Sequence, residues 1–217
     1  MSIAGGLATV RARIARACEA AGRDPASVQL VAVSKTKRAE DVRAAYDAGQ
    51  RLFGENYVQE LHEKAGALAG LDGLRWHFIG HLQRNKAKEV VEVASCIETV
   101  DSARLADAIA KRVPAGARLD LMLQVNVARE PQKSGCMPEE LAALIAHVRG
   151  LDTLALRGLM TVPPADEDPR PHFRALRELA RQHGLTELSM GMSADLEDAI
   201  AEGATIVRVG TAIFGSR

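Results

Sequence analysis

Lys35 is the residue of this sequence best placed to act as a nucleophile. It ends the apolar run 28–35, Val-Gln-Leu-Val-Ala-Val-Ser-Lys, which predicts a buried strand. Parallel α/β folds place their chemistry at the carboxyl ends of strands. Partial burial or a nearby cation favours the neutral amine of such a lysine, which can then attack a carbonyl carbon. A lysine that follows a strand is usually a solvated loop residue, so the run alone leaves both interpretations open.

Two later loops carry groups suited to an anion. Ser193 follows the predicted strand Glu187–Met190 and precedes a predicted helix, so its hydroxyl can cap that helix or donate to a ligand. Gly210 and Thr211 follow the predicted strand Thr205–Val209. Glycine lets the backbone approach a ligand closely, and Thr211 adds a hydroxyl. Backbone N–H groups of the two loops could together hold a dianion.

Arg208 is a third candidate, because it lies inside a predicted strand. It stands between Val207 and Val209, so its side chain faces opposite to the two valines. A buried arginine needs a partner, which is either a carboxylate or a ligand. Its guanidinium stays protonated and can only donate hydrogen bonds.

Strands and helices alternate along the chain that must position these residues. A helix is predicted over Ile3–Ala21, with apolar residues at helical spacing. Strands are predicted at Val28–Ser34, Arg51–Gly54, Leu74–Ile79, Cys96–Val100, Leu119–Val127, Leu154–Thr161, Glu187–Met190 and Thr205–Val209. Helices are predicted at Glu40–Ala48, Val58–Leu68, Lys86–Val93, Ser102–Arg112, Pro138–Val148, Pro171–His183 and Leu196–Glu202.

This alternation predicts an α/β fold with a parallel sheet, and eight units predict a closed (β/α)8 barrel. An open doubly wound sheet is the competing architecture, but no Gly-x-Gly-x-x-Gly follows the first strand. In a closed barrel the first and eighth strands are neighbours. Lys35 and the loop of Ser193 then lie roughly 10 Å apart around one rim. Pyridoxal phosphate carries an aldehyde for the lysine and a phosphate for the loops on one ring, whose nitrogen is a candidate partner for Arg208.

The composition restricts the function classes. The chain has 217 residues, 47% of them hydrophobic, which suits one domain over 1–217. Its 28 basic and 28 acidic residues balance, so no nucleic-acid partner is expected. Cys18, Cys96 and Cys136 lack metal-ligand spacing, which favours a reducing compartment. With no signal-peptide pattern and no run of ~20 apolar residues, we expect a cytoplasmic protein without a membrane partner.

Several other residues have both a structural and a functional interpretation. His77 and His81 are four residues apart, but a strand pattern and Gly80 separate them, and we expect no metal site. Cys136 lies in a predicted loop and is either an ordinary free thiol or a reactive one. The basic run Gln83–Lys88 fits a solvated helix start or a surface that receives a ligand at the barrel mouth.

Six motifs lie in order along essentially the whole chain: residues 33–37, 53–60, 76–86, 158–161, 188–195 and 208–215. Together they resemble the pyridoxal phosphate homeostasis protein family, the single-domain relatives of alanine racemase. The resemblance implies a modified (β/α)8 barrel with an extra N-terminal helix, like the N-terminal domain of alanine racemase.

The resemblance also implies the cofactor and the residues that hold it. Pyridoxal 5'-phosphate is expected as an aldimine on Lys35. The phosphate contacts are expected from Ser193, Gly210 and Thr211, and the ring-nitrogen contact from Arg208. Asn56 matches an asparagine that lines the site, and no catalytic residue is implied. The family is associated with the balance of vitamin B6, amino acids and keto acids, without established turnover, and recipient apo-enzymes that depend on the cofactor are candidate partners.

Two enzymatic alternatives stay open from the sequence. A pyridoxal phosphate-dependent amino-acid racemase needs a base on each face of the carbanion. Relatives that racemise alanine take the second base, a tyrosine, from a second domain, which we expect to be absent because this sequence ends at Arg217 directly after the eighth strand. Tyr57 is the residual candidate for that base. The missing domain also predicts a monomer and a cofactor open to water. The other alternative is a cofactor-free Schiff-base aldolase, which would be colourless.

Overall fold

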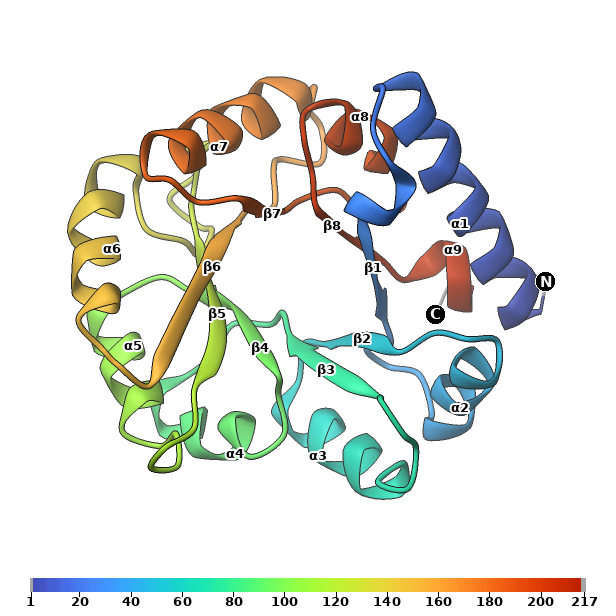
Figure 1. Ribbon diagram of the computed structural model, residues 1–217, viewed down its shortest axis with the longest axis horizontal. Coiled ribbons are helices and arrows are strands. Elements are labelled where there is room, and N and C mark those ends of the chain that lie inside the picture. Colours follow the sequence, from blue (N-terminus) through green and yellow to red (C-terminus); the bar gives the residue numbers. More distant parts are fainter. Residues whose placement is uncertain (1, 216–217) are drawn as a thin grey trace.

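The strands of this chain close into a barrel, as the computed structural model of residues 2–215 shows (Figure 1). All strand pairs are parallel, and β1 pairs with β8 to complete the ring. The strands are β1 (Gln29–Val33), β2 (Leu52–Glu55), β3 (Arg75–Phe78), β4 (Cys96–Val100), β5 (Leu119–Gln124), β6 (Leu154–Met160), β7 (Glu187–Ser189) and β8 (Ile206–Val209). The predicted closed barrel is therefore confirmed, and the open sheet is wrong.

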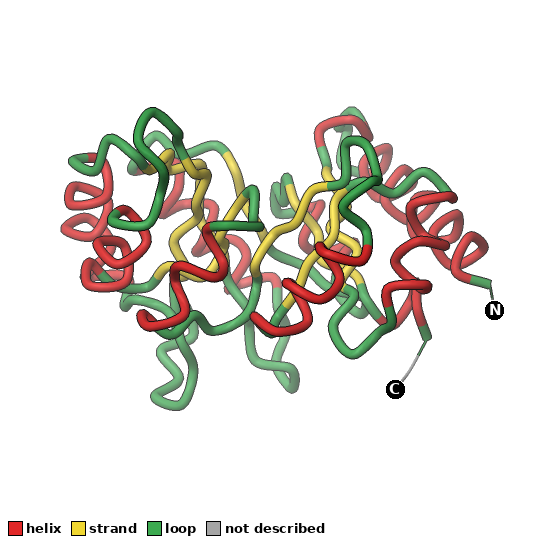
Figure 2. The backbone as a smooth tube through the Cα atoms, turned by 90° about the horizontal axis from the view of Figure 1, so that it is seen from below, coloured by secondary structure: helices red, strands yellow, loops and turns green. Residues whose placement is uncertain are grey.

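Helices surround the barrel on its outer side (Figures 1 and 2). They are α1 (Ile3–Ala20), α2 (Ala39–Asp47), α3 (Val58–Ala67), α4 (Ala87–Val91), α5 (Ala103–Ala110), α6 (Leu141–Arg149), α7 (Arg170–Gln182), α8 (Leu196–Ala201) and α9 (Thr211–Phe214). Short 3-10 turns precede β1, α4 and α6, namely η1 (Pro25–Ser27), η2 (Arg84–Lys86) and η3 (Pro138–Glu140). Each crossover thus passes outside the sheet, as right-handed βαβ units require.

The end of β5 differs from its predicted boundary. The apolar pattern predicts a strand to Val127, but β5 ends at Gln124. Beyond it the backbone pairs with a later loop: Cys136 N donates to Gln124 O at 2.9 Å, and Asn126 N donates to Cys136 O at 2.9 Å. This pairing across the loop depends on tertiary structure, so hydrophobic periodicity could not locate it.

The alternation of side chains along the strands separates two apolar cores. One set packs as a small cluster inside the barrel, and its members are Val31, Leu52, Cys96, Met122, Met160 and Ile206. The opposite set, with residues such as Ala32, Phe53 and Val207, packs with the helices in the larger cluster outside the sheet. Each fully buried aliphatic or aromatic side chain stabilises the fold by about 1.5–3 kcal/mol.

Helix α1 covers the junction where β8 meets β1. It packs against α8 and the short α9, which follows β8 directly. A Cβ on Gly6 would lie 2.7 Å from Ile213 O, so the close approach of α1 and α9 requires glycine at this position. The extra N-terminal helix expected from the sequence is therefore present, and its contacts place it over the junction of β8 and β1.

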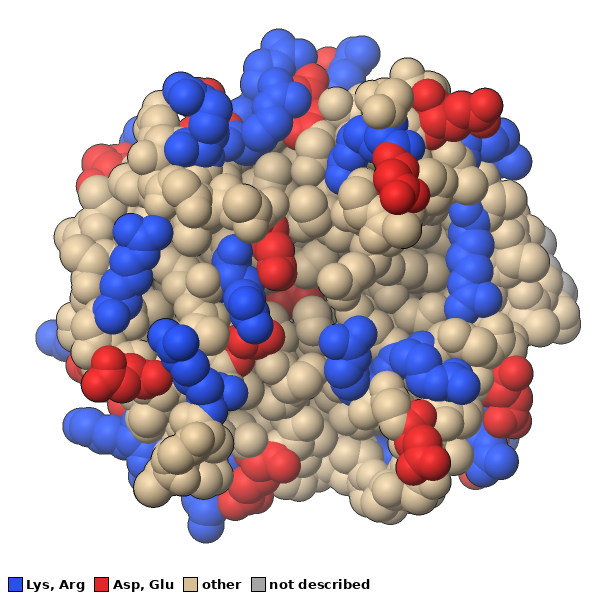
Figure 3. Space-filling view, in the orientation of Figure 1, with Lys and Arg blue, Asp and Glu red and all other residues tan. Residues whose placement is uncertain are grey.

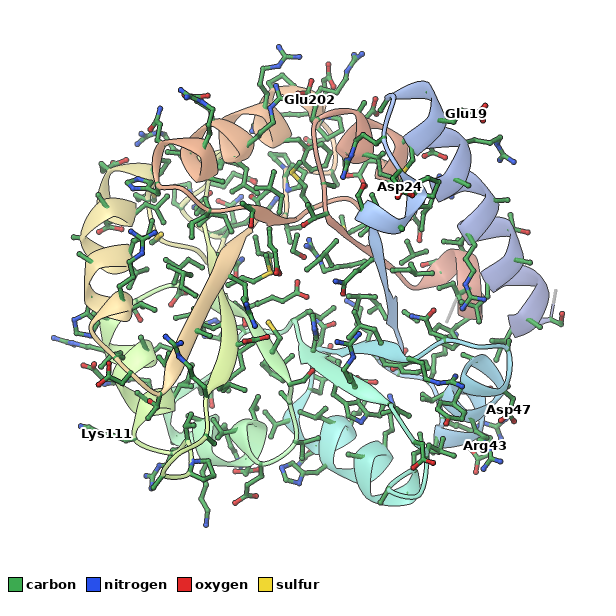
Figure 4. The ribbon with its side chains drawn as sticks, in the orientation of Figure 1. Glu19, Asp24, Arg43, Asp47, Lys111 and Glu202 are labelled. Carbon is green, nitrogen blue, oxygen red and sulfur yellow. The ribbon has the colours of Figure 1, made fainter. Side chains whose placement is uncertain are left out.

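The outer surface carries charges of both signs. Figure 3 shows Lys, Arg, Asp and Glu spread over one face rather than collected by sign. Ion pairs at the periphery include Arg43 with Asp47 on α2 and Arg174 with Glu202, three of whose members are labelled in Figure 4. Within residues 2–215, no helix combines the length and apolarity needed to cross a membrane. In the same range, no group of three potential ligand side chains could hold a metal ion.

Candidate cofactor site

One pocket at the carboxyl end of the barrel collects all six candidate residues. It has a volume of about 410 Å³. The six are Lys35, Asn56, Ser193, Arg208, Gly210 and Thr211, and the other walls are Val33, Ile79, Met160, Val162, Met192 and Ala194. Two larger surface hollows of about 490 and 660 Å³ contain no lysine. Of these three cavities, the smaller pocket is the one that combines an amine with both candidate anion-binding loops, so its chemistry rather than its size makes it the candidate site.

The alternation along β1 aims Lys35 at this pocket. Val31 lies in the barrel interior and Val33 lines the pocket, whereas Ser34 between Val33 and Lys35 is buried on the outer side. Lys35 continues the inner set. The β1–β8 register pairs Ala32 with Val209, which brings Gly210 beside the end of β1. Lys35 and Gly210 therefore lie on one rim of the barrel.

Gly210 lies directly against the strand that leads to Lys35. A Cβ at this position would meet Val33 O at 3.1 Å, so a larger residue would crowd the wall between the two pocket loops. Thr211 next to it is exposed at the pocket and begins α9. The first N–H groups of a helix have no partner inside it, so this loop retains donors for an anion.

The loop after β7 is shaped by glycine and held by the N-terminal helix. Gly191 has φ +92°, and a Cβ there would come within 2.5 Å of Ala199 Cβ. Arg13 on α1 donates from Nη2 to Ser193 O at 3.0 Å and binds Glu197 through Nε at 2.7 Å. The loop is therefore fixed from both sides, with Ser193 at the pocket.

Ser193 does not cap α8, which corrects the prediction that its hydroxyl could do so. The N-cap residue is Asp195, two positions later. Its carboxylate turns back and accepts from Met192 N at 2.6 Å. Within residues 2–215 the Ser193 hydroxyl has no hydrogen bond, so it is available to a ligand in the pocket.

Arg208 is the buried cation at the floor of the pocket. Its side chain is on the inner face, and Val207 and Val209 belong to the outer core, as strand alternation predicts. Nη1 donates to Ser189 Oγ at 2.6 Å and Nη2 donates to Thr161 O at 2.8 Å. A guanidinium has five N–H groups, so donors remain for a ligand acceptor.

A carboxylate inside the barrel balances this arginine. Glu98 is fully buried and accepts from Ser189 Oγ at 2.5 Å. Its other oxygen is 2.6 Å from His77 Nδ1, and Arg208 Nη1 is 3.9 Å from Oε2. We name these four residues, His77, Glu98, Ser189 and Arg208, the interior network. They come from β3, β4, β7 and β8, so the network ties together strands on opposite sides of the barrel.

The interior network sets the charges of its members. Burial lowers the pKa of the Arg208 guanidinium, and the charge of Glu98 opposes that shift. Burial alone would raise the pKa of Glu98. The hydrogen bond and charge of His77, the charge of Arg208 and the Ser189 hydroxyl outweigh burial, and the pKa of Glu98 falls below its ordinary value of 4.5. Glu98 is therefore an anion at neutral pH.

Asn56 offers an unsatisfied acceptor at the pocket. Its Oδ1 is buried and has no hydrogen-bond partner among the described residues. The backbone of Asn56 is confined by Gly80, where a Cβ would lie 2.0 Å from Asn56 O. An unpaired buried polar atom is unfavourable, so this amide is suited to a ligand that donates a hydrogen bond to it.

The remaining candidate residues lie outside the pocket walls. Tyr57 is 51% exposed at the start of α3 and does not line the pocket. Burial, together with the charges of Glu140 and Asp101, raises the pKa of the Cys136 thiol to about 12, which makes it an unreactive thiol. Of the basic run, Gln83, Arg84 and Asn85 line the separate hollow of about 660 Å³.

Sequence reasoning missed Glu98 and Ser189, and it considered His77 only as a metal ligand. One signal was available: Glu98 stands alone in the middle of the apolar strand Cys96–Val100. A buried carboxylate requires a partner, and strand alternation gives the face on which it lies. The identity of the partner could not be derived, because Arg208 is far along the chain.

The alanine racemase N-terminal domain family has a model that matches residues 6–217. The chain belongs to this family. A curated relative from Pseudomonas aeruginosa, named pyridoxal phosphate homeostasis protein, is 52% identical over 222 residues, with 100% of this chain and 96% of the relative covered. A relative from Escherichia coli with the same name is 44% identical and covers 99% of this chain and 97% of the relative.

Solved structures agree with the family assignment. PipY from Synechococcus elongatus, solved with PLP bound, is 40% identical, has a TM-score of 0.86 and covers 99% of this chain and 100% of PipY. An alanine racemase from Clostridium difficile has a TM-score of 0.77 at 15% identity, and this chain spans 57% of it. That second likeness shows a shared fold. The racemase-type barrel expected from the sequence is thus confirmed.

Proposed function

We propose that this protein binds pyridoxal 5'-phosphate on Lys35 and acts in the homeostasis of that cofactor. One observation carries the proposal: a single pocket combines Lys35, the buried Arg208 and the two loops of Ser193 and Gly210–Thr211. The names of the curated relatives and the PLP bound to PipY support the same cofactor. The residues present fit it, because amine, cation, anion-binding loops and an unpaired Asn56 oxygen match its functional groups.

Each pocket residue has a role in this proposal. The bound cofactor would supply an aldehyde carbon, to which Lys35 would attach through Nζ with loss of water. Ser193 and Thr211 would hold the phosphate through their hydroxyl groups, together with backbone N–H groups of both loops. Arg208 would donate to the ring nitrogen and could not protonate it, which would keep the ring a weak electron sink.

The walls of the pocket favour a carrier over an enzyme. Among the described lining residues there is no Asp, Glu, His, Cys or Tyr that could serve as a second base. Tyr57, the candidate for this base from the sequence, does not line the pocket, and about half of its surface is exposed. A two-base racemisation therefore lacks its second base in these walls. We accordingly propose binding without turnover.

Peptide mapping tests the attachment site. The protein is reconstituted with pyridoxal phosphate, reduced with borohydride to convert the C=N bond into a stable amine, and digested. We expect a visible absorption band before reduction and the label on the peptide of Lys35, with Lys37 unlabelled. Lys35→Ala should lose both signals. A label on Lys37, or a colourless protein without an adduct, would contradict the site, and the second result would favour the cofactor-free aldolase.

Chirality measurements test the absence of turnover. Reconstituted protein is incubated with single enantiomers of several amino acids, and the enantiomeric ratio is followed by chiral chromatography. We expect the enantiomeric ratio to change no more than it does in a parallel incubation with Lys35→Ala. Steady racemisation or consumption of any amino acid, lost in Lys35→Ala, would overturn the carrier role.

The carrier role includes further proposals about partners and state. We propose a cytoplasmic monomer that passes the cofactor to apo-enzymes that depend on it. Sedimentation of the reconstituted protein should give one species near the monomer mass. Both mixtures contain a scavenging amine that traps free cofactor. Under this condition the loaded protein should activate an apo-aminotransferase faster than an equal amount of free cofactor does. Equal rates would remove the transfer step.

A further inference from the structure

Both peptide groups next to Lys35 are held by side chains of α3. The carbonyl of the peptide before it, Ser34 O, accepts from Lys64 Nζ at 2.7 Å. The N–H of the peptide after it, Thr36 N, donates to Glu60 Oε2 at 2.7 Å. A side chain from the outer layer of the barrel thus fixes the backbone on either side of the candidate nucleophile.

The two contacts belong to one cluster, which is buried except for the partly exposed Glu60. Lys64 Nζ also donates to Glu55 Oε1 and to Glu60 Oε2, each at 2.7 Å. Ser34 Oγ donates to the same Glu55 oxygen at 2.6 Å. We name Ser34, Glu55, Glu60 and Lys64 the outer clamp. An ammonium has three N–H donors, and Lys64 uses all three inside the outer clamp.

Burial makes the outer clamp costly, which calls for a role besides stability. Lys64 is 5% exposed and Glu55 is 0% exposed. Glu55 Oε2 is buried without a hydrogen-bond partner among the described residues. Well-packed apolar residues could often replace a buried ion pair without loss of stability, so such a pair is weak evidence for a purely stabilising function.

The backbone that the clamp holds is strained. Thr36 has φ +62°, in the left-handed region that a β-branched residue rarely adopts. Such strain persists only where the surroundings determine the conformation, and it gathers at functional sites. Thr36 itself is exposed, so core packing does not impose the conformation. A backbone hydrogen bond from Lys37 N to Ser34 O at 3.0 Å closes this turn. The bond from Thr36 N to Glu60 and the bond from Lys64 to Ser34 O add side-chain contacts from α3 that oppose its relaxation.

We propose that Lys64, through Glu60 and the Ser34 carbonyl, is the positioning residue that holds the strained turn and thereby aims Lys35 into the pocket. The inference rests on the proposed function for the identity of the carbonyl that Lys35 meets. The anion-binding loops follow β7 and β8 and have no hydrogen bond with the outer clamp among the described residues. The clamp should therefore govern the covalent step and leave the phosphate contacts unchanged.

Paired ligands separate these two steps. Pyridoxal phosphate reports adduct formation, and pyridoxine phosphate, with an alcohol in place of the aldehyde, reports binding through phosphate and ring alone. In Lys64→Met and Glu60→Ala we expect the equilibrium constant for the adduct to fall at least tenfold. Affinity for pyridoxine phosphate should stay within twofold of the unchanged protein.

Matched variants guard against a simple folding defect. Glu60 is partly exposed, so Glu60→Ala should keep the circular dichroism of the unchanged protein even if Lys64→Met does not. Glu60→Gln keeps an acceptor for Thr36 N and should recover at least half of the adduct. Asparagine tolerates the left-handed conformation better than threonine does. Adding Thr36→Asn to Glu60→Ala should therefore raise the equilibrium constant for the adduct at least threefold above that of Glu60→Ala alone.

Amide exchange of the cofactor-free protein gives a readout independent of pyridoxal phosphate. The Thr36 N–H should exchange at least tenfold faster in Glu60→Ala than in the unchanged protein, measured by NMR. The positioning role would be overturned if the clamp variants lost affinity for pyridoxal phosphate and pyridoxine phosphate equally. An unchanged Thr36 exchange rate in Glu60→Ala would overturn it as well. If the unchanged protein forms no adduct, the proposed function fails, whereas faster Thr36 exchange in the variant would still support the clamp.

Discussion

Glu98 in the interior network and Glu55 in the outer clamp are both fully buried, but their surroundings shift their pKa values in opposite directions. Both oxygens of Glu98 have partners, and two basic side chains face it, which lowers its pKa. For Glu55, burial outweighs the bonds from Lys64 and Ser34 and raises the pKa, and the charge of Glu60 adds to the rise. The outer clamp sets two carboxylates against one lysine and leaves Glu55 Oε2 unpaired.

The difference indicates what each cluster does for the pocket. In the interior network, the anion balances Arg208, so the cation at the pocket floor stays charged and fixed. In the outer clamp, the Lys64 ammonium donates to two carboxylates and to the Ser34 carbonyl. Lys64 and Glu60 together order the backbone beside Lys35. Burial alone therefore does not define the role of a carboxylate; the ratio of donors to acceptors around it does.

The largest effect is expected for Glu98→Gln. The substitution leaves Arg208 buried without its anion, which typically costs about 3–5 kcal/mol of unfolding free energy. Because the folded pKa of Glu98 lies below 4.5, its contribution is present above that pH and is lost as the pH falls through the folded pKa. Urea denaturation at pH 7 and near pH 4 should show a smaller deficit in acid. A loss below about 1 kcal/mol at pH 7 would mean that Glu98 does not balance Arg208.

Glu55→Gln should have a smaller effect with the opposite pH trend. Losing hydrogen bonds to a charged group costs about 1–3 kcal/mol. Because the folded pKa of Glu55 is raised, the unchanged protein loses stability as the pH rises from 4.5 through the folded pKa. The deficit of Glu55→Gln should therefore be larger near pH 4.5 than at pH 7. Parallel pH trends for the two variants would remove the contrast between the clusters.

Asp47→Asn provides the surface reference. Its pair with Arg43 on α2 is more than half exposed on both sides, and the two residues lie at the periphery in Figure 4. Such an i, i+4 pair contributes about 0.3–0.5 kcal/mol. The same urea titrations should detect almost no change and little dependence on pH. A deficit comparable to that of Glu55→Gln would show that charge, rather than burial, sets the scale.

Strand alternation and the order of the strands were enough to predict the barrel and to bring Lys35, Ser193 and Arg208 to one rim. These inferences succeed because side-chain direction has period 2 and because closure makes β8 a neighbour of β1. The partners of Glu98 and Glu55 could not be predicted. They depend on which side chains meet across the barrel or from α3, and a single sequence holds no signal for that choice.

The pairing of β1 with β8 has a consequence for synthesis of the protein. The ring closes only when residues 29–33 of β1 pair with residues 206–209 of β8. Contacts between segments so distant in sequence form late and slow folding. The wall between Lys35 and Gly210 does not exist on a growing chain until β8 has left the ribosome. A nascent chain that lacks β8 therefore cannot form this pocket, and the ability to bind a ligand there appears only when β8 has paired with β1.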